Sequence, residues 1–222
     1  MIFKNRQHAG QKLAQELDDL VGQEDLLVLG VPRGGVPVAF EIAQHLHAPL
    51  DVFLSRKLGV PGQEELAFGA ITADGGRFLD SEIVAAAGLS SAEIETITRA
   101  TEEKVRERAR LYREGRPPLK VEGRTVILVD DGVATGASMY AAMQVLEGMK
   151  PKRLIVAVPV VSRNAGSWLR LHADRLVTLH APENFYAVGQ FYNDFSQVSD
   201  DEVINLLRRA DRMVAGLTPE EG

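Results

Sequence analysis

The chain has 222 residues, of which 45% are hydrophobic and 25% charged, and it contains no cysteine. This composition is typical of an ordinary globular protein, and the lack of cysteine excludes disulfides, thiolate metal sites and cysteine nucleophiles. The net charge of −6 argues against nucleic acid or an anionic membrane surface as a partner, because both favour basic patches. The charged N-terminal stretch and the lack of a long apolar run predict a cytoplasmic protein without a membrane span.

The elements predicted along the chain alternate between short apolar strands and amphipathic helices. In chain order they are helix 7–21, strand 26–30, helix 36–47, strand 50–55, a hairpin of 67–72 with 77–79, helix 93–112, strand 125–129, helix 135–149, strand 154–160, helix 163–172, strand 176–180 and a last helix ending near 214. Asp-Gly and Gly-Gly between the two hairpin arms supply the positive φ that tight turns need. Capping-box patterns at 90–93 and 199–202 mark the starts of two helices.

Strands that alternate with helices predict a parallel sheet covered by helices on both faces. In such sheets, ligands bind beyond the carboxyl ends of the strands, at the point where the strand order reverses. The loops that follow Gly30, Ser55, Val129 and His180 are therefore the candidates for a binding site.

The most informative stretch is an apolar strand, 126–129, followed by Asp-Asp-Gly-Val-Ala-Thr-Gly-Ala-Ser. The strand brings Asp130 and Asp131 to the edge of the sheet, and the turn of small residues behind them lets backbone N–H groups converge on a phosphate at a helix N-terminus. The hydroxyls of Thr135 and Ser138 are further donors. Carboxylates repel phosphate, but they accept hydrogen bonds from ribose hydroxyls and stabilise positive charge at an anomeric carbon. The pattern therefore predicts a phosphorylated sugar that reacts at C1; the alternative is that the two aspartates only cap a helix.

This strand and turn resemble the phosphoribosyl-pyrophosphate motif of type I phosphoribosyltransferases. The resemblance implies an α/β fold, a three-layer α/β/α sandwich with a mostly parallel central sheet and a small hood. It also implies that 5-phosphoribosyl-1-pyrophosphate (PRPP) is bound with Mg²⁺, and that Asp130 and Asp131 face the ribose hydroxyls and reach the metal through water. The residues implied to wrap the 5′-phosphate are Gly132, Val133, Ala134, Thr135, Gly136, Ala137 and Ser138.

The same resemblance implies a single domain over residues 1–222. Its parts would be a core at about 24–180, a helical insertion of open role at about 81–115, and a hood with the C-terminal helix at about 181–216. Family likeness also makes the 67–72 strand an antiparallel candidate within the otherwise parallel sheet. The implied strand order puts the loops after Gly30 and Val129 on either side of the reversal point.

Pyrophosphate contacts are expected first from the loop at 31–35. Gly34 and Gly35 would let backbone N–H groups face the diphosphate, and Arg33 would add positive charge, as in the short pyrophosphate loop of the family. Taken alone, Pro-Arg-Gly-Gly is equally compatible with a plain strand-to-helix turn.

A second set of pyrophosphate contacts is expected from Arg56 and Lys57, which follow the second predicted strand. Several family members have an Arg-Lys pair there, whose lysine meets the pyrophosphate. With Arg33 and Mg²⁺, Lys57 would neutralise the charge that grows as the diphosphate leaves; the alternative is that both residues are surface cations. Segment 58–65 is rich in glycine and proline, and it lies where the family has a mobile loop that keeps water from the reacting centre. The alternative is that the segment is an ordinary surface loop.

Aromatic residues are concentrated after the strand predicted at 176–180. In the family, a variable hood at this place holds the acceptor base, and an aromatic face can bind a heterocycle. The acceptor-side candidates are Phe185, Tyr186, Val188 and Tyr192. The alternative is a small hydrophobic cluster under a long loop.

The predicted function is transfer of the 5-phosphoribosyl group of PRPP to a nitrogenous, heterocyclic base, with release of pyrophosphate. The predicted catalytic residues are Asp130, Asp131, Lys57 and Arg33. One alternative is a regulator that binds PRPP or a nucleotide without turnover, and another is a hydrolase of a related sugar phosphate that needs no acceptor. The expected partners are small molecules, and family analogy favours a homodimer. The sequence leaves the acceptor open.

Overall fold

The structure is a computed structural model that describes residues 1–73, 75–113 and 115–216. Asp74, in the predicted hairpin turn, and Glu114, near the end of the predicted helical insertion, lie outside the described residues. The described chain forms two compact units. The first contains Met1–Phe53, Val121–Gly136 and the described residues from Pro151 onward, and the second contains Leu54–Lys120 and Ala137–Lys150. The single domain expected from the sequence stays a prediction.

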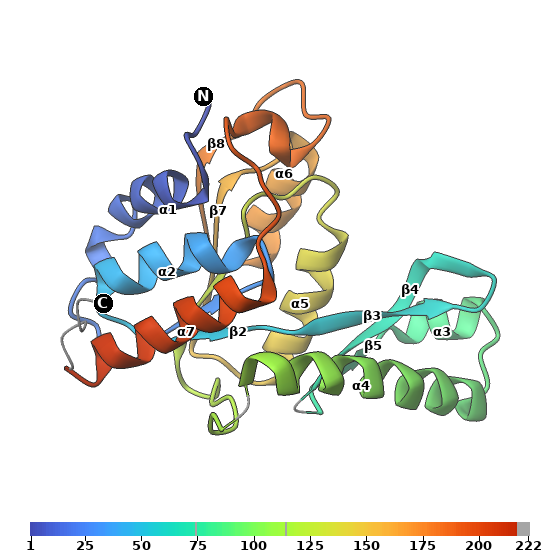
Figure 1. Ribbon diagram of the computed structural model, residues 1–222. Helices are drawn as coiled ribbons and strands as arrows, with labels where there is room; N and C mark the ends of the chain where they lie inside the picture. Colours follow the sequence, from blue (N-terminus) through green and yellow to red (C-terminus); the bar gives the residue numbers. More distant parts are fainter. Residues whose placement is uncertain (74, 114, 217–222) are drawn as a thin grey trace. The chain divides into compact units, whose positions relative to one another are not determined.

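The first unit is built on a five-stranded sheet (Figure 1). Its strands are β1 (Leu26–Gly30), β2 (Leu50–Val52), β6 (Thr125–Val129), β7 (Arg153–Val160) and β8 (Arg175–His180). Their order is β2-β1-β6-β7-β8, and every neighbouring pair is parallel. All residues of β1 and β6 are buried, as continuous apolar strands are in a sheet that is covered on both faces.

Helices cover both faces of this sheet. They are α1 (Arg6–Gln15), α2 (Gly35–Leu46), α6 (Arg163–His172) and α7 (Asp200–Val214). Helices α1, α2 and α7 pack together on one face, and α6 lies on the other (Figure 1). Right-handed crossovers explain this, because the step from β1 to β2 and the step from β7 to β8 run in opposite directions across the sheet. The predicted three-layer α/β/α fold is confirmed.

The strand order reverses between β1 and β6. From β1 the chain moves to β2 at one edge, whereas from β6 it moves through β7 to β8 at the other. The loops after Gly30 and Val129 therefore flank the reversal point, as predicted, and the N–H of Val31 donates to the carbonyl oxygen of Val129 at 2.8 Å. A crevice at such a point is the usual place for a ligand in sheets of this kind.

The helix predicted at 7–21 is shorter in the structure. It ends at Gln15, and a separate 3₁₀ turn, η1 (Asp18–Leu20), follows. Leu17 has φ −115° and ψ 14°, so the helix is interrupted there. Leu17 and Leu20 are both buried, which explains why the apolar spacing in the sequence continues past the end of the helix.

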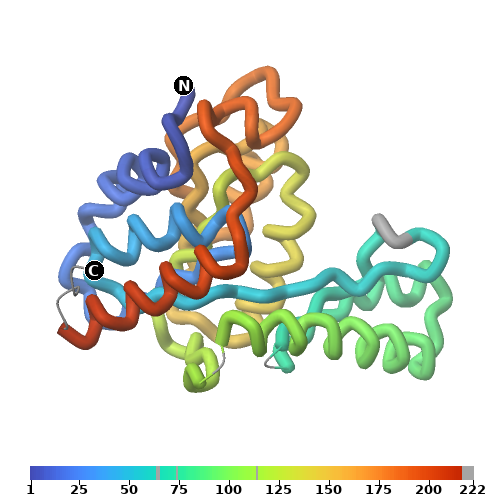
Figure 2. Tube along the Cα trace, in the orientation of Figure 1, coloured from blue at the N-terminus to red at the C-terminus, as the bar shows by residue number. Residues whose placement is uncertain are grey.

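The second unit is a small antiparallel sheet with three helices. Its strands, in sheet order, are β3 (Ser55–Val60), β4 (Gln63–Thr72) and β5 (Arg77–Leu79), and its helices are α3 (Ser81–Ala86), α4 (Ser91–Arg113) and α5 (Ala137–Gly148). The buried cluster of this unit contains Leu58, Val60, Phe68 and Ile71. The predicted helical insertion packs on this sheet through α4. The predicted hairpin of β4 with β5 is confirmed, and β3 with β4 forms a second hairpin (Figure 2).

Two predictions about the strands of this region are wrong. The strand predicted at 50–55 ends at Val52, and a strand of the other sheet begins at Ser55. The strand predicted at 67–72 is antiparallel, as expected, but it belongs to the small sheet and not to the central one. Periodicity finds an apolar strand well, but it does not say which sheet the strand joins.

Segment 58–65, predicted to be a loop, is also mostly strand. Val60 pairs with Gln63, so only two residues form the turn between β3 and β4. Gly62 in this turn has φ 77°, a conformation that glycine adopts without steric cost. The Pro-Gly dipeptide therefore marks a tight turn inside a hairpin.

Both predicted capping boxes start helices in the structure. The N–H of Ser90 donates to the Glu93 carboxylate at 2.9 Å, and the N–H of Glu93 donates back to the Ser90 hydroxyl at 3.3 Å. The N–H of Glu202 donates to the Ser199 hydroxyl at 3.1 Å. These side chains satisfy backbone N–H groups that a helix start leaves without a partner.

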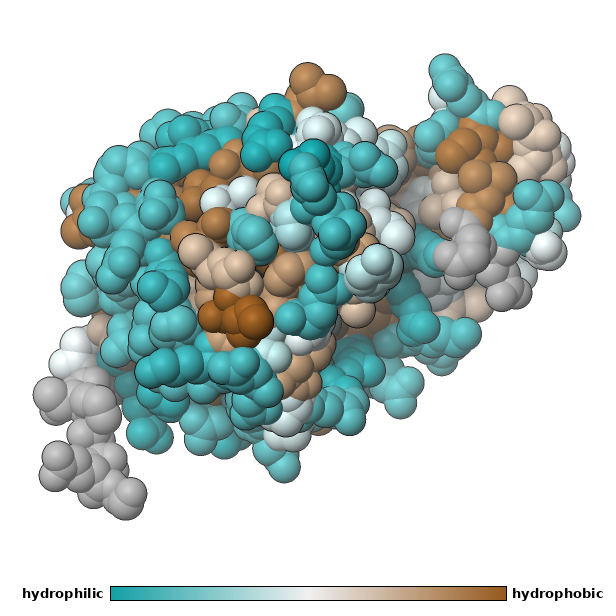
Figure 3. Space-filling view, turned by 90° about the horizontal axis from the view of Figure 1, so that it is seen from above, coloured by the Kyte–Doolittle hydropathy of each residue, from teal (hydrophilic) through white to brown (hydrophobic). Residues whose placement is uncertain are grey.

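The face of the molecule drawn in Figure 3 is mostly hydrophilic, and hydrophobic side chains appear on it in small separate groups. Among the large hydrophobic side chains of the described residues, Tyr186 and Leu171 are the most exposed, at 87% and 81%. No helix in the described part of the chain combines the length and the apolar character that crossing a membrane requires.

Candidate active site

Two adjacent carboxylates stand at the carboxyl end of β6. Asp131 is buried, with 8% of its surface exposed, whereas Asp130 is half-buried. The N–H of Asp131 donates to the Asp130 carboxylate at 2.8 Å, which fixes the direction of the Asp130 side chain. The predicted position of the acidic pair, beside the reversal point of the sheet, is the one that the structure gives.

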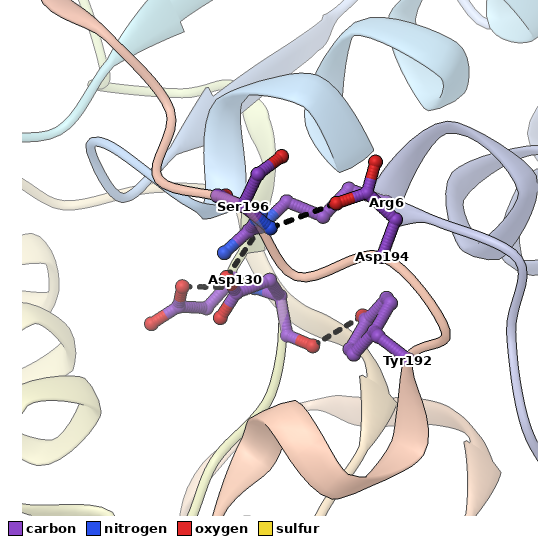
Figure 4. A network of polar contacts seen from close by, with 6 residues as sticks. Arg6, Asp130, Tyr192, Asp194 and Ser196 are labelled. Atoms are coloured by element: carbon purple, nitrogen blue, oxygen red, sulfur yellow. Dashed lines mark hydrogen bonds and ion pairs between the residues drawn. The ribbon is translucent and has the colours of Figure 1, made fainter.

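Asp131 is held from two sides by residues from the two ends of the chain (Figure 4). Nε of Arg6 lies 2.7 Å from Oδ2 of Asp131, and Nη1 of Arg6 donates to the carbonyl oxygen of Ser196 at 2.8 Å. The Arg6 guanidinium also lies over the ring of Phe195, 3.9 Å from its centroid. The hydroxyl of Tyr192 donates to the backbone carbonyl oxygen of Asp131 at 2.6 Å.

Burial changes the acidity of this group of side chains. It raises the pKa of Asp130 well above the usual carboxyl value, and the neighbouring charge of Asp131 raises that pKa further. Burial also raises the pKa of Asp131, while the hydrogen bond and charge of Arg6 oppose the shift. The pKa of the buried Tyr192 hydroxyl is raised by burial and by the Asp131 charge. Strongly shifted carboxyls in a partly open position are typical of functional sites.

The loop after β1 packs closely against the acidic pair. A Cβ added to Gly34 would lie 2.0 Å from Oδ2 of Asp131, and one added to Gly35 would lie 2.6 Å from the carbonyl oxygen of Val129. Both glycines are therefore required by close approach of the backbone, a reason that the sequence analysis did not give. The loop and the acidic pair form one group of residues in the first unit.

Arg33 lies in the same loop and is partly exposed. Its Nη1 is 3.9 Å from Oδ1 of Asp200, at the start of α7. The peptide bond between Pro32 and Arg33 is cis. The loop is a strand-to-helix turn, which was one of the two alternatives for this sequence, and it also borders the acidic pair.

The turn predicted to bind the 5′-phosphate is fixed at its start. The N–H of Val133 donates to the carbonyl oxygen of Val160 at 3.0 Å, and the hydroxyl of Ser162 donates to the carbonyl oxygen of Ala134 at 2.6 Å. The N–H of Val133 is therefore occupied by the protein, so the predicted phosphate contact of this residue cannot come from its backbone N–H. Gly136 has φ 86°, which favours glycine at this position.

Three further N–H groups of the turn have no partner among the described residues. Within the described residues, the N–H groups of Ala134, Thr135 and Gly136 donate to no oxygen, and Ala134 and Thr135 are exposed. Ala137 and Ser138, the last two candidates for this phosphate, are exposed and begin α5 in the second unit. Unpaired N–H groups that precede a helix are suited to an anion.

The hood candidates are divided by the structure. Tyr192 is 6% exposed, and Phe185 packs on Phe191 with ring centroids 5.2 Å apart. Tyr192 is therefore not placed to stack on an acceptor, and the alternative of a small hydrophobic cluster holds for these rings. Val188 lies against the acidic turn, because a Cβ added to Gly132 would be 2.5 Å from Cγ1 of Val188.

Tyr186 is the exposed member of the set, at 87%. Its loop is fixed by one side chain, since the Gln190 amide oxygen accepts from the N–H groups of Tyr186 and Ala187 at 3.0 and 3.2 Å. The Gln190 amide also donates to the carbonyl oxygen of Asn184 at 3.0 Å. An exposed ring on an ordered loop remains available for a ligand.

Arg56 and Lys57 do not lie in a loop of the central sheet. Both are in β3 of the second unit, where Arg56 pairs with Ile71 and Lys57 pairs with Ala70. Arg56 is exposed and Lys57 is half-buried. Their prediction depended on a strand ending at Ser55, which is where β3 begins instead.

Sequence reasoning missed Arg6 and the carbonyl oxygen of Ser196. Arg6 and Asp131 are 125 positions apart in the chain, and an arginine at the start of a helix has no pattern that marks it. Tyr192 was found through the concentration of aromatic residues, but its contact with the acidic pair was not predicted.

Comparison with known proteins agrees with the fold. The sequence profile of the "Phosphoribosyl transferase domain" family matches residues 2–196. Two proteins of Mycobacterium tuberculosis, from strains CDC 1551 and H37Rv, have names that assign them provisionally to the phosphoribosyl transferases. Each is 46% identical to this chain, and the match covers 95% of this chain and 47% of the relative. The chain thus spans about half the length of these curated relatives.

A crystal structure of the protein TT1426 from Thermus thermophilus is similar over nearly all of both chains. The TM-score is 0.87 and the sequence identity is 44%, and the match covers 94% of this chain and 99% of TT1426. The chain belongs to the phosphoribosyl transferase domain family.

Proposed function

We propose that this chain transfers the 5-phosphoribosyl group of PRPP to a nitrogenous, heterocyclic acceptor and releases pyrophosphate. One observation carries the proposal. A pair of adjacent carboxylates, Asp130 and Asp131, stands where the sheet order reverses, and a turn with unpaired N–H groups follows it directly. Carboxylates that accept hydrogen bonds from sugar hydroxyls lie at one end of this short segment, and N–H groups that donate to a phosphate lie at the other. This combination suits a sugar phosphate.

Asp130 would bind the ribose most directly. It is half-buried, and no described side chain forms an ion pair with it. Its carboxylate would accept a hydrogen bond from a ribose hydroxyl, and the two negative charges would stabilise positive charge that develops at C1. The neighbouring Asp131, held by Arg6, would supply the second charge from a fixed position.

The turn at 134–136 would hold the 5′-phosphate. Its three N–H groups donate to no described oxygen, and the Thr135 hydroxyl is exposed beside them. Held at both ends, the sugar would present C1 to the acceptor. The bond from C1 to the pyrophosphate oxygen breaks and pyrophosphate keeps the electron pair, while a bond forms from C1 to the acceptor nitrogen, which loses its proton.

Mg²⁺ fits this arrangement as an ion that arrives with the substrate. Among the described residues, no group of three or more His, Asp or Glu side chains is placed to hold a metal ion. Mg²⁺ commonly keeps several waters and binds through substrate phosphates with one or two carboxylates, so Asp130 and Asp131 would reach it through water. When bound, it would neutralise the charge of the leaving pyrophosphate.

Further contacts to pyrophosphate are proposed for Arg33, Gly34, Gly35, Arg56 and Lys57. The support is the position of the first three beside the acidic pair and the positive charge of the other two.

Tyr186 is the proposed stacking surface for the acceptor, because its ring is exposed on a loop that the Gln190 side chain holds. A cytoplasmic location and a homodimer are part of the same proposal, and sedimentation analysis would test the dimer.

Pyrophosphate release tests the proposal. Wild-type protein is incubated with PRPP, Mg²⁺ and each of a panel of purines, pyrimidines and other nitrogen heterocycles. We expect release that depends on one acceptor and that is abolished in the Asp130→Asn, Asp131→Asn double variant, whose folding is checked by circular dichroism. Release at the same rate without any acceptor would indicate a hydrolase, and PRPP binding without release under any acceptor would indicate a regulator.

A further inference from the structure

The N-terminal segment and the segment before α7 meet around Asp131, and we propose that Arg6 is a positioning residue that fixes the direction of the Asp131 carboxylate for the sugar. Arg6 lies far from the motif at 130–138 in the sequence, and the motif does not predict it. The inference rests on the proposed function, because it assigns Arg6 a role at the same site.

Two stretches of backbone place Arg6. The N–H of Phe3 donates to the carbonyl oxygen of Phe191, and the N–H of Asn193 donates to that of Phe3, both at 2.8 Å. The N–H of Asp194 donates to the carbonyl oxygen of Lys4 at 3.0 Å. These bonds fix the N-terminal segment along residues 191–194 (Figure 2), so the start of α1 has one position relative to the hood.

The Arg6 side chain is in turn fixed at three points. Nε contacts the Asp131 carboxylate at 2.7 Å, Nη1 donates to the Ser196 carbonyl oxygen at 2.8 Å, and the guanidinium plane covers Phe195. Only 11% of the Arg6 side chain and 12% of the Asp131 side chain are exposed. A planar guanidinium can make all three contacts at once, whereas an ammonium group is a point charge.

Three residues contact Asp131 at different atoms. The Asp130 carboxylate accepts from the N–H of Asp131, the Tyr192 hydroxyl donates to the backbone carbonyl oxygen of Asp131, and Arg6 contacts the Asp131 carboxylate. Burial raises the pKa of Asp131, and the hydrogen bond and the charge of Arg6 oppose this shift. Without Arg6 the pKa of Asp131 would rise further, and the carboxylate would lose the hydrogen bond that fixes its direction.

An ion pair that is largely buried is weak support for stability, since a hydrophobic pair of equal volume often stabilises a fold as well or better. Its place next to the proposed sugar-binding Asp130 is explained more simply by function. The charge of Arg6 lets two carboxylates remain side by side, which the sugar needs and the fold does not.

The test compares three variants. Arg6→Gln removes the charge, and Arg6→Lys keeps the charge but removes the planar guanidinium. Arg175→Gln is the matched control, because Nη1 of Arg175 contacts the Asp19 carboxylate at 2.7 Å and Nη2 donates to the carbonyl oxygen of Glu16 at 2.8 Å. That pair stands at the amino end of β8, whereas Asp131 follows the carboxyl end of β6. Binding of PRPP with Mg²⁺ is measured by calorimetry across pH, and the Asp131 carboxyl is titrated by ¹³C NMR without ligand.

We expect Arg6→Gln to weaken PRPP binding by roughly 10- to 100-fold, to raise the pKa of Asp131, and to move the acid limb of binding to higher pH. Arg6→Lys should restore much of the pH profile and only part of the affinity, and Arg175→Gln should match wild type. Wild-type affinity in Arg6→Gln, or equal losses in Arg6→Gln and Arg6→Lys with no movement of the pH profile, would overturn the inference.

Failure of the proposed function would look different. Wild-type protein would then give no PRPP binding at all, before any variant is compared. The NMR titration in the free protein still tests the role of Arg6 in that case, since an unchanged Asp131 pKa in Arg6→Gln contradicts the inference by itself.

Discussion

The two halves of the candidate site are built in opposite ways. Asp131 is buried and bonded on both its side chain and its backbone, whereas the turn at 134–136 is largely exposed and keeps its N–H groups free of described partners. The first half is organised before any ligand arrives and carries the cost of burying charge. Under the proposed function, the 5′-phosphate would complete the second half. A sugar phosphate would use both halves at once.

The largest effect should come from the half-buried carboxylate. We expect Asp130→Asn to lower kcat/KM for PRPP by roughly 100- to 1000-fold, because it removes a charge that stabilises the transition state. Steady-state assays of pyrophosphate release measure this. Asp19→Asn, which changes an exposed carboxylate of the first unit, is the control and should keep wild-type activity. A loss of less than about threefold in Asp130→Asn would remove Asp130 from the mechanism.

The next effect tests the close approach of the loop to the acidic pair. Gly34→Ala would put a methyl group 2.0 Å from the Asp131 carboxylate, so either the loop or Asp131 must move. Overpacking of this kind costs about 1–3 kcal/mol of the free energy of unfolding, and we expect activity to fall by roughly tenfold or more. Gly148→Ala is the matched control, because nothing lies within 4 Å of a Cβ added to Gly148. Equal behaviour of the two variants in denaturant and in activity assays would refute close packing at Gly34.

The phosphate half should respond in KM. Thr135→Val keeps the shape of the side chain but removes its hydroxyl, and a hydrogen bond to a charged group contributes about 1.5–3 kcal/mol. We therefore expect KM for PRPP to rise by roughly tenfold or more while stability stays near that of wild type. Thr96→Val, whose hydroxyl bonds to the Ala92 carbonyl oxygen in α4, controls for the substitution itself. A fall in kcat with unchanged KM would mean that Thr135 acts elsewhere.

The smallest effect concerns stability against pH. The pKa of Asp130 is raised in the folded protein, so the group stabilises the fold while it is protonated and loses that contribution as pH rises through the raised pKa. The side chain of Asn does not titrate, so the variant does not lose stability in this way. As pH rises above the ordinary carboxyl range, the melting temperature of Asp130→Asn should therefore increase relative to that of wild type, by roughly 2–4 °C for each kcal/mol. A constant difference over this rise in pH in calorimetric scans would show that Asp130 titrates normally.

Local patterns predicted much of this molecule. The strand before Asp130 is predicted with the bounds that the structure gives, because a continuous apolar run followed by a turn of small residues is a strong local signal. The position of the acidic pair at the sheet reversal was predicted from the strand order that the resemblance to type I phosphoribosyltransferases implies.

What the sequence did not predict depends on contacts between distant segments. Arg6 reaches Asp131 across 125 positions, and Gly34 is needed because a carboxylate from β6 lies against it. The β3–β4 hairpin was hidden because Pro-Gly in a tight turn and Pro-Gly in a long loop look alike in sequence. Which sheet a strand joins, and which polar group a buried carboxylate meets, are decided by tertiary packing.

The most direct test of the account is a crystal structure of the protein with PRPP and Mg²⁺. The account predicts ribose hydroxyl oxygens within hydrogen-bond distance of the Asp130 carboxylate and the 5′-phosphate on the N–H groups of residues 134–136. A sugar bound elsewhere, with Asp130 facing only protein and the turn without a phosphate, would contradict it.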